Sequence, residues 1–139
     1  MAKLTLKNPV IMVNLVDLSD HFSEVSIETS RDEVDVTAFG AVNKEMVAGL
    51  GDATITGTVF QDYAATKVDA TLWPLSTSDT PFTVTVKPTS AVTSATNPVY
   101  SMSCLLFTYN PVSGSVGEAA TTEVTFRNAS QAGLTRATA

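Results

Sequence analysis

The groups in this chain that could perform acid–base chemistry are a single histidine and several carboxylates. His21 is the only histidine, and Asp17 and Asp20 lie close to it in the sequence. The members of a Ser–His–Asp triad meet in space and need not be sequence neighbours. The chain contains no Gly-x-Ser-x-Gly motif, however, and a histidine beside a turn is far more often a solvated surface residue. We therefore predict no catalytic residues and no enzymatic activity.

The motifs that would hold a cofactor or a metal are missing or incomplete. Gly49-Leu50-Gly51 lacks the third glycine of a dinucleotide-binding motif, and a strand pattern follows it instead of a helix. Its glycines are better explained as turn residues. The single cysteine, Cys104, excludes an internal disulfide and a cysteine-based zinc site. Its apolar surroundings favour a small buried side chain. We predict no cofactor and no metal.

The carboxylates between positions 22 and 39 alternate with apolar residues. Glu24 and Glu28 alternate with Val25 and Ile27, and a second alternating run follows Arg31-Asp32. If Arg31-Asp32 is the turn of a hairpin, one face of the hairpin is apolar. The opposite face then carries four carboxylates, namely Glu24, Glu28, Glu33 and Asp35. Such a face is either a solvated outer surface, which alternation alone favours, or an acidic wall along a passage.

A mainly β fold must position these side chains. Threonine, serine and valine alternate with a period of two through much of the chain, which is typical of strands. With 139 residues, of which 44% are hydrophobic, the chain can form one domain with its own core. The predicted fold is a single β-sandwich over residues 1–139. We predict its strands near Val10–Val16, Phe22–Ser30, Glu33–Phe39, Ala53–Gln61, Phe82–Lys87, Val99–Tyr109 and Glu123–Arg127.

One segment has the periodicity of a helix. Asp62 is a suitable N-cap and Pro74 a suitable stop for a short helix ending near Leu72. Three apolar residues between them recur at intervals of four, namely Ala64, Val68 and Leu72. We predict that this helix flanks the sandwich and that Trp73 anchors it to the core.

Several segments have neither pattern. We predict a long loop at residues 41–52 and a connection rich in serine, threonine, alanine and proline at residues 88–98. Residues 1–8 and 129–139 have little apolar patterning, and we predict that they are flexible arms.

Composition restricts the classes of partner. There are 14 acidic and 8 basic residues, so the formal net charge is −6 and the chain repels phosphate. A protein that binds DNA or RNA through its backbone is therefore not expected. No stretch approaches the roughly 18 apolar residues of a membrane-spanning helix. The start Met1-Ala2-Lys3-Leu4 lacks the apolar region of a signal peptide. We expect synthesis in a cytoplasm, without a membrane anchor.

The stretch from Val34 to Tyr63 carries a family pattern. It begins VDVTAFG and, after a loop, continues KEMVAGLGDATITGTVFQDY. A later turn at Asn110–Gly117 leads into the strand pattern Thr121–Phe126. The chain resembles the major tail tube proteins of long-tailed bacteriophages, above all those with non-contractile tails that infect actinobacteria. The specific part of the resemblance covers about a quarter of the chain. Its matching positions are Val36, Thr37, Phe39, Gly40, Gly49, Leu50, Thr56, Gly57, Gln61, Asp62 and Tyr63.

The resemblance implies a structural role. Tail tube proteins are β-sandwiches with one flanking helix, and their inner strands join between subunits into a β-barrel. Hexameric rings of them stack into a tube that conducts double-stranded DNA into the host. The resemblance therefore implies a virion protein, made in the host bacterial cytoplasm and located in the tail. It also implies ruler, terminator and distal tail proteins as further partners.

The same resemblance gives roles to two sets of residues. The loop and the arms would reach the next ring, with contacts expected at Lys44, Glu45, Met46, Gly49 and Leu50. Glu24, Glu28, Glu33 and Asp35, or a subset of them, would line the bore, and Arg31 would pair across subunits. An acidic wall lets DNA pass without specific binding, whereas inward cations would bind phosphate.

Two other functions stay open. A binding or decoration module, immunoglobulin-like or carbohydrate-binding, needs exposed aromatic residues gathered on one face. The candidates here are dispersed in the sequence, namely Tyr63, Trp73, Tyr100 and Tyr109. A related assembly protein, such as a tail terminator or the tube of a secretion system, shares the tail tube fold and is poorly separated from it by sequence.

Overall fold

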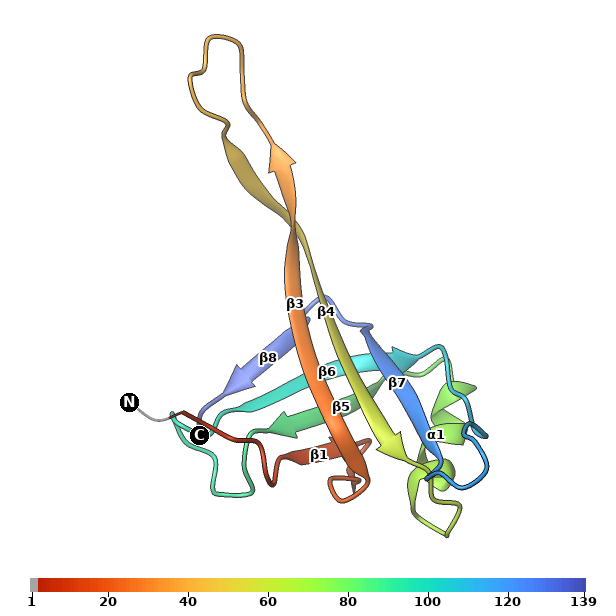
Figure 1. The fold of residues 1–139 in the computed structure, drawn as a ribbon. Coiled ribbons are helices and arrows are strands. Elements are labelled where there is room, and N and C mark those ends of the chain that lie inside the picture. Colours follow the sequence, from red (N-terminus) through yellow and green to blue (C-terminus); the bar gives the residue numbers. More distant parts are fainter. Residues whose placement is uncertain (1–2) are drawn as a thin grey trace.

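The computed structural model describes residues 3–139, which form eight strands and one helix (Figure 1). In chain order these are β1 (Val10–Val13), β2 (Val16–Asp17), β3 (Phe22–Asp35), β4 (Met46–Phe60), α1 (Val68–Ser76), β5 (Phe82–Lys87), β6 (Val99–Leu106), β7 (Thr121–Asn128) and β8 (Leu134–Ala137). The prediction of a mainly β fold with one short helix is confirmed.

The strands form one antiparallel sheet in the order β2-β1-β5-β6-β7-β4-β3. The strand β6 lies at a branch, because β8 pairs with its first half, Val99–Met102, and β7 pairs with its second half, Cys104–Leu106. The sheet curls, so that β3 and β4 cross in front of β1, β5 and β6 (Figure 1). One apolar core therefore lies between the two ends of a single sheet.

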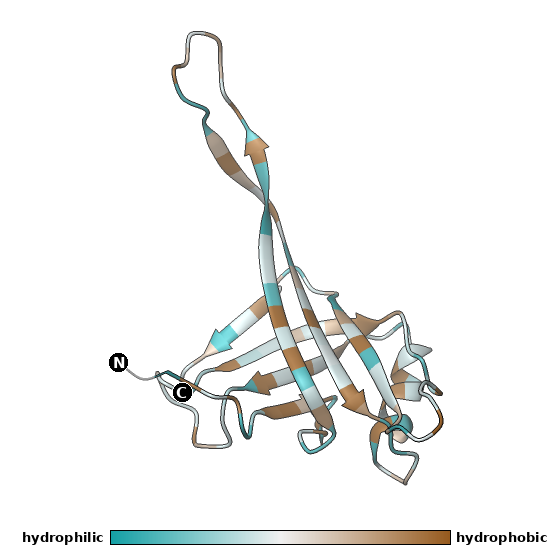
Figure 2. Cartoon of the chain, viewed as in Figure 1, coloured by the Kyte–Doolittle hydropathy of each residue, from teal (hydrophilic) through white to brown (hydrophobic). Residues whose placement is uncertain are grey.

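The core consists of the inward-facing residues of each strand. Along residues 53–60 of β4 and along β5 and β7, buried and more exposed residues alternate, as the period of two predicts. Figure 2 shows hydrophobic and more hydrophilic residues following one another along these strands. Phe82 and Phe126 meet edge to face, with ring centroids 5.9 Å apart. Cys104 is completely buried, which confirms its predicted role as a small core side chain.

The predicted first strand is interrupted by a tight turn. Asn14 and Leu15 have φ values of 49° and 68°, and they separate β1 from β2, which pair with each other. Two successive positive φ values are typical of the two-residue turn that joins twisted strands. The alternating pattern continues through this turn and therefore conceals it.

The predicted hairpin with its turn at Arg31-Asp32 is wrong. The strand β3 runs without interruption through these residues, and Arg31 pairs with Gly51 of β4. The turn is made instead by residues 36–45, beyond Asp35. Figure 1 shows that β3 and β4 extend as a two-stranded hairpin well beyond the rest of the sheet. Adjacent charges there are solvated within a strand, so they do not indicate a turn.

The predicted loop at 41–52 is only partly a loop. Residues from Met46 onward belong to β4, and β4 pairs with β3 over its whole length. A register shift between Arg31 and Glu33 marks a bulge in this projecting part. The predicted connection at 88–98 lies between β5 and β6, and the side-chain amide of Asn97 donates to Ala91 O at 2.8 Å within it.

The helix is shifted from its predicted position. It begins at Val68 instead of Asp62, and Pro74 lies within its last turn instead of ending it. Val68 and Leu72 are buried in the core, but Trp73 is 53% exposed, so the predicted anchoring role of Trp73 is wrong. At the C-terminus, the predicted arm 129–139 contains β8, which pairs with β6. Of the predicted arm 1–8, Met1 and Ala2 lie outside the described residues, and residues 3–8 have no regular strand or helix.

Candidate assembly interface

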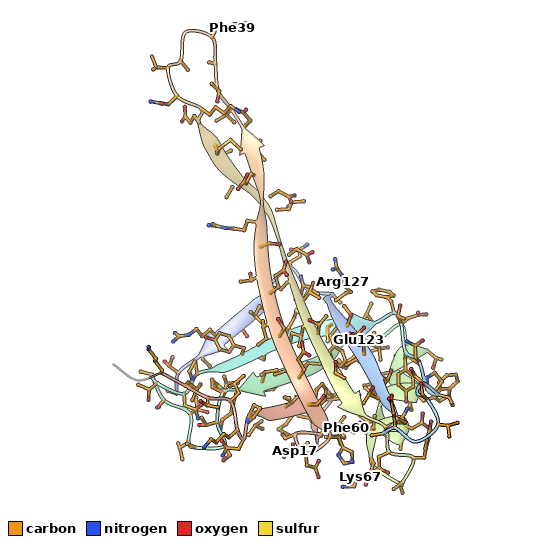
Figure 3. The ribbon with its side chains drawn as sticks, in the orientation of Figure 1. Asp17, Phe39, Phe60, Lys67, Glu123 and Arg127 are labelled. Carbon is orange, nitrogen blue, oxygen red and sulfur yellow. The ribbon has the colours of Figure 1, made fainter. Side chains whose placement is uncertain are left out.

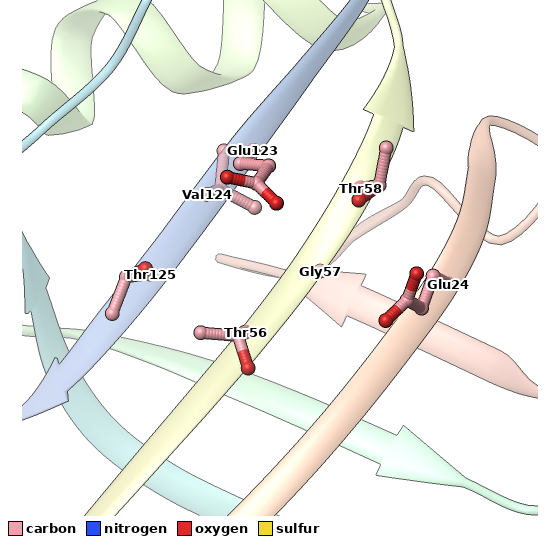
Figure 4. A pocket seen from close by; sticks show the side chains of 7 residues that line it. All are labelled: Glu24, Thr56, Gly57, Thr58, Glu123, Val124 and Thr125. Atoms are coloured by element: carbon pink, nitrogen blue, oxygen red, sulfur yellow. The ribbon is translucent and has the colours of Figure 1, made fainter.

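The outer face of β3, β4 and β7 is polar. In each strand the residues that alternate with core residues face away from the core, and pairing aligns them in rows across the three strands. One row contains Glu24, Thr58 and Glu123, and the next contains Ser26, Thr56 and Thr125. Figure 4 shows Glu24 and Glu123 on either side of β4. They border a shallow hollow of about 230 Å³, where two carboxylates flank small hydroxyl side chains.

A third row brings the one arginine of this face into an ion pair. It contains Glu28, Thr54 and Arg127. Arg127 lies 3.1 Å from Asp52 Oδ2 and also donates to Thr54 Oγ1 at 3.1 Å. Both partners of the ion pair are about half exposed. We define the polar face as these three rows. It keeps an acidic character, because Asp52 compensates the positive charge of Arg127.

The structure brings together only two of the four predicted bore residues. Glu24 and Glu28 lie on the polar face. Glu33 and Asp35 lie beyond it on the projecting hairpin, and their odd positions in the uninterrupted strand β3 place them on its opposite side. Glu123 joins Glu24 instead. Its alternation with Thr122 and Val124 marked it as outward-facing, but only the strand register shows its neighbours.

The free edge of β3 is long. This strand has 14 residues and pairs only with β4 among the described strands. A typical strand has about 5–6 residues. An unpaired edge is a template for another chain, and proteins often block it with lysine or proline. The segment FSEVSIETSRDEVD contains neither, and its six charged residues would discourage pairing only with a partner strand of the same charge. The edge of β3 can therefore accept a strand from a partner.

The residues predicted to contact a neighbouring ring lie along the projecting hairpin. Lys44 and Glu45 belong to the turn, and Glu45 N donates to Thr37 Oγ1 at 2.8 Å. Met46, Gly49 and Leu50 belong to β4, and Leu50 is 82% exposed. A Cβ at Gly49 would lie 3.0 Å from side-chain atoms of Asp32 and Val34, so a larger residue there would require these side chains to shift. Whether these residues contact another copy stays a prediction.

The tip of the hairpin is apolar and uncovered. Phe39 and Val42 are fully exposed, and Figure 3 shows Phe39 at the far end of the hairpin. Gly40, between them, has a φ of 85°, a conformation that favours glycine.

His21 links the start of β3 to the segment after β4. Its Nδ1 lies 2.8 Å from Asp20 Oδ1 and its Nε2 lies 2.8 Å from Asp62 Oδ2, and its side chain is 16% exposed. The hydrogen bond with Asp62, followed by that with Asp20, raises the pKa of His21. The backbone N–H of Ala64 and then His21 lower the pKa of Asp62. Because carboxylates occupy both ring nitrogens, the arrangement resembles a structural clamp more than a catalytic base.

Two further groups with raised pKa values are structural. Burial raises the pKa of the Cys104 thiol to about 12. Burial also raises the pKa of Tyr109 to about 12, and its hydroxyl donates to Asp69 Oδ1 at 2.8 Å. Gln61 Nε2 in turn donates to Tyr109 Oη at 2.9 Å. These contacts attach the segment after β6 to α1 and to the end of β4.

Residues 3–139 contain no group of three or more side chains placed to hold a metal ion. No helix in this range is long and apolar enough to cross a membrane.

Solved structures share this fold along almost its whole length. A chain in the virion of a native gene transfer agent particle matches with a TM-score of 0.76 and 16% identity, over 96% of this chain and 98% of that one. The protein has the fold of tail and tube assemblies. A chain in the sheath/tube terminator of an extracellular contractile injection system matches with a TM-score of 0.73 and 14% identity, over 98% and 97%. A chain in the sheath–tube complex of such a system has a TM-score of 0.72 and 12% identity, over 99% and 93%.

Because the sequence identities are only 12–16%, these matches show a shared tail-tube fold and nothing finer. No protein-family model matches the chain, and no curated protein sequence is similar to it. The similarity to solved structures therefore supports the fold that the sequence pattern of Val34–Tyr63 predicted.

Proposed function

We propose that this protein is a structural, non-enzymatic tail tube protein of a long-tailed bacteriophage and that its copies join into hexameric rings stacked as a tube. The unpaired 14-residue edge of β3 carries this proposal. A second copy can extend the sheet at this edge, and repetition around a ring closes the extended sheet into a barrel without free edges. The likeness to chains of a gene transfer agent virion supports the same role.

In this arrangement the polar face lines the bore. Glu24, Glu28 and Glu123 repel phosphate, and Asp52 compensates the one arginine of the face. Double-stranded DNA could then pass without binding to the wall, because no uncompensated cation on the polar face displaces counterions from its phosphates. Glu33 and Asp35, on the hairpin, would face a neighbouring copy instead. The resemblance of Val34–Tyr63 to tail tube proteins of actinobacterial phages supports a non-contractile tail.

The assembly is tested with the purified protein by negative-stain electron microscopy. We expect stacked rings or long tubes with an axial channel. A protein that stays a monodisperse monomer at high concentration, as a glycan-binding or decoration module would, contradicts the proposal.

The role of the β3 edge is tested with proline. The Val36 N–H donates to Glu45 O, toward β4. Because N–H directions alternate along a strand, odd-numbered residues such as Thr29 present their N–H to the free edge. Thr29→Pro should therefore leave the protomer folded, since edge strands tolerate such a proline, but abolish rings and tubes. Thr29→Val, which keeps the N–H, is the control and should assemble normally.

A tube or terminator protein of a contractile injection system is the second candidate, favoured by the matches at TM-scores of 0.73 and 0.72. Microscopy also bears on this choice. A terminator should give single rings, whereas a tube protein should give stacks of many rings.

A further inference from the structure

The apolar tip of the hairpin has a complement elsewhere on the molecule. A groove of about 360 Å³ lies between the N-terminal segment and the inner side of β3, β5 and β6. Its lining is mostly apolar, namely Leu4, Leu6, Pro9, Val25, Ile27, Val86, Pro88 and Tyr100, with Lys87 beside them. This volume is that of roughly a dozen water molecules, so the groove has room for a phenylalanine and a valine side chain.

Charge also matches between tip and groove. The hairpin from Arg31 to Glu45 has four acidic residues against two basic ones, which gives it a net charge of −2. Four basic residues lie in or beside the groove, against one acidic residue, Glu24, which lines an adjoining hollow with Leu6 and Pro9. Lys3 and Lys7 belong to the N-terminal segment, Lys87 lines the groove, and Arg136 pairs with Tyr100 in the groove wall. The sequence has no acidic residue from Met1 to Asn8 or from Thr80 to Val116.

The tip does not occupy the groove of its own protomer. The paired strands β3 and β4 hold the tip at the far end of the projecting hairpin (Figures 1 and 3). The groove is lined instead by Leu4 and Leu6 of the N-terminal segment and by residues of the body. Phe39 and Val42 consequently remain fully exposed. Apolar side chains of this size are commonly covered by a partner when they cluster.

We propose that the hairpin tip of one copy, with Phe39 and Val42, docks into the Leu4–Leu6–Ile27 groove of a second copy. This inference rests on the proposed tube function and names the contact that the hairpin makes. Tip and groove are different surfaces, so the contact is heterologous. Each copy can use its tip on one neighbour and its groove on another, so the contact can be repeated from copy to copy. Its small area makes a single contact weak, and it acts together with pairing at the β3 edge.

Cysteine cross-linking tests this contact directly. Cys104 is buried with its pKa raised to about 12, so it does not compete with exposed thiols. Thr5→Cys lies between two groove residues, and Ala38→Cys lies beside Phe39, and both positions are exposed. The double variant, assembled and treated with a bis-maleimide, should give a ladder of covalent oligomers. Each single variant should stay monomeric on a denaturing gel.

The outcomes separate this inference from the proposed function. Tubes that form without a ladder overturn the docking contact but leave the tube intact. A dimer from Ala38→Cys alone would show tip-to-tip packing and would also overturn it. If neither rings nor tubes form, the proposed function fails.

A pair of matched valine variants gives an independent measurement. Val42 at the tip and Val116 in the loop before β7 are both fully exposed, so neither replacement by serine should unfold the protomer. Val42→Ser should raise the protein concentration needed for assembly at least tenfold, whereas Val116→Ser should leave it unchanged. Equal effects of the two variants, or no effect of either, contradict docking at the tip.

Discussion

At the scale of single residues, the His21 clamp makes stability depend on pH. The raised pKa of His21 means that protonation favours the folded state. This contribution is fully present below the ordinary histidine value of 6.5 and is lost as pH rises through the higher folded value. Asp20 and Asp62 have pKa values lowered from the ordinary aspartate value of 3.8. Their contribution to the stability of the folded state is therefore present above pH 3.8 and is lost as the pH falls through their lower folded values.

His21→Ala should therefore lower the melting temperature more at pH 5.5 than at pH 8. Thermal unfolding of wild type and variant at the two pH values measures this difference. His21→Gln keeps hydrogen-bonding capacity without titrating. The difference in melting temperature between His21→Gln and His21→Ala should therefore be the same at both pH values. An equal loss for His21→Ala at both pH values would show that the clamp does not depend on protonation.

Gly57 is a second residue with a specific physical requirement. A Cβ at this position would lie 2.6 Å from Phe22 Cε2 and 3.0 Å from the carbonyl oxygen of Glu24. Gly57→Ala should therefore destabilise the protomer by about 1–3 kcal/mol, the usual cost of overpacking. Chemical denaturation measures it. The control is Gly51→Ala on the same strand, where the nearest atoms lie at 3.7 Å or more, and it should be nearly neutral.

At the scale of elements, the strands that pack on the core were predictable and the projecting hairpin was not. The alternation of Phe82–Lys87 is set by burial on one side, and the predicted strand has the observed bounds. From Arg31 to Asp52 neither face of β3 or β4 is buried, so burial imposes no alternation there. The alternation after Arg31-Asp32 predicted a separate strand, and 41–52 was predicted as a loop. The same limit explains the predicted site. Glu24 and Glu28 were assigned to one face correctly, but joining Glu33 and Asp35 to them depended on a turn that does not exist.

The projecting hairpin should be the least protected part of the sheet before assembly. Its backbone hydrogen bonds are exposed to solvent and have no core beneath them, so they open locally. In hydrogen exchange, the paired segments 32–35 and 46–49 should exchange much faster than 25–28 and 54–58 in the unassembled protomer. On assembly, the hairpin should become protected. Fast exchange of the hairpin in intact tubes would mean that no neighbour covers it.

At the scale of the whole molecule, charge placement matters more than the total charge. Glu24→Lys with Glu28→Lys changes the net charge from −6 to −2, since each replacement adds two. Tubes of this variant should form and should retain double-stranded DNA at low salt, because lysines on the polar face bind phosphate. Gel retardation at increasing salt concentration measures this retention.

The matched control has the same net charge with the lysines elsewhere. Asp79 and Glu118 are exposed in loops outside the polar face, so Asp79→Lys with Glu118→Lys should retain much less DNA inside the tube. If both double variants bind DNA equally, the polar face is not the surface that DNA meets.

The length of the projecting hairpin sets a geometric limit on any filament built from this chain. From Thr54, where β7 begins to pair with β4, eight strand residues lead up to Met46 and half of a ten-residue turn leads on to the tip. At about 3.3 Å per residue this reaches on the order of 40 Å. If each tip touches the body of a neighbour in the next layer, the gap between the bodies of successive layers cannot exceed this reach. The number of residues between Arg31 and Asp52 would thus set an upper bound on the distance that separates the bodies of successive layers.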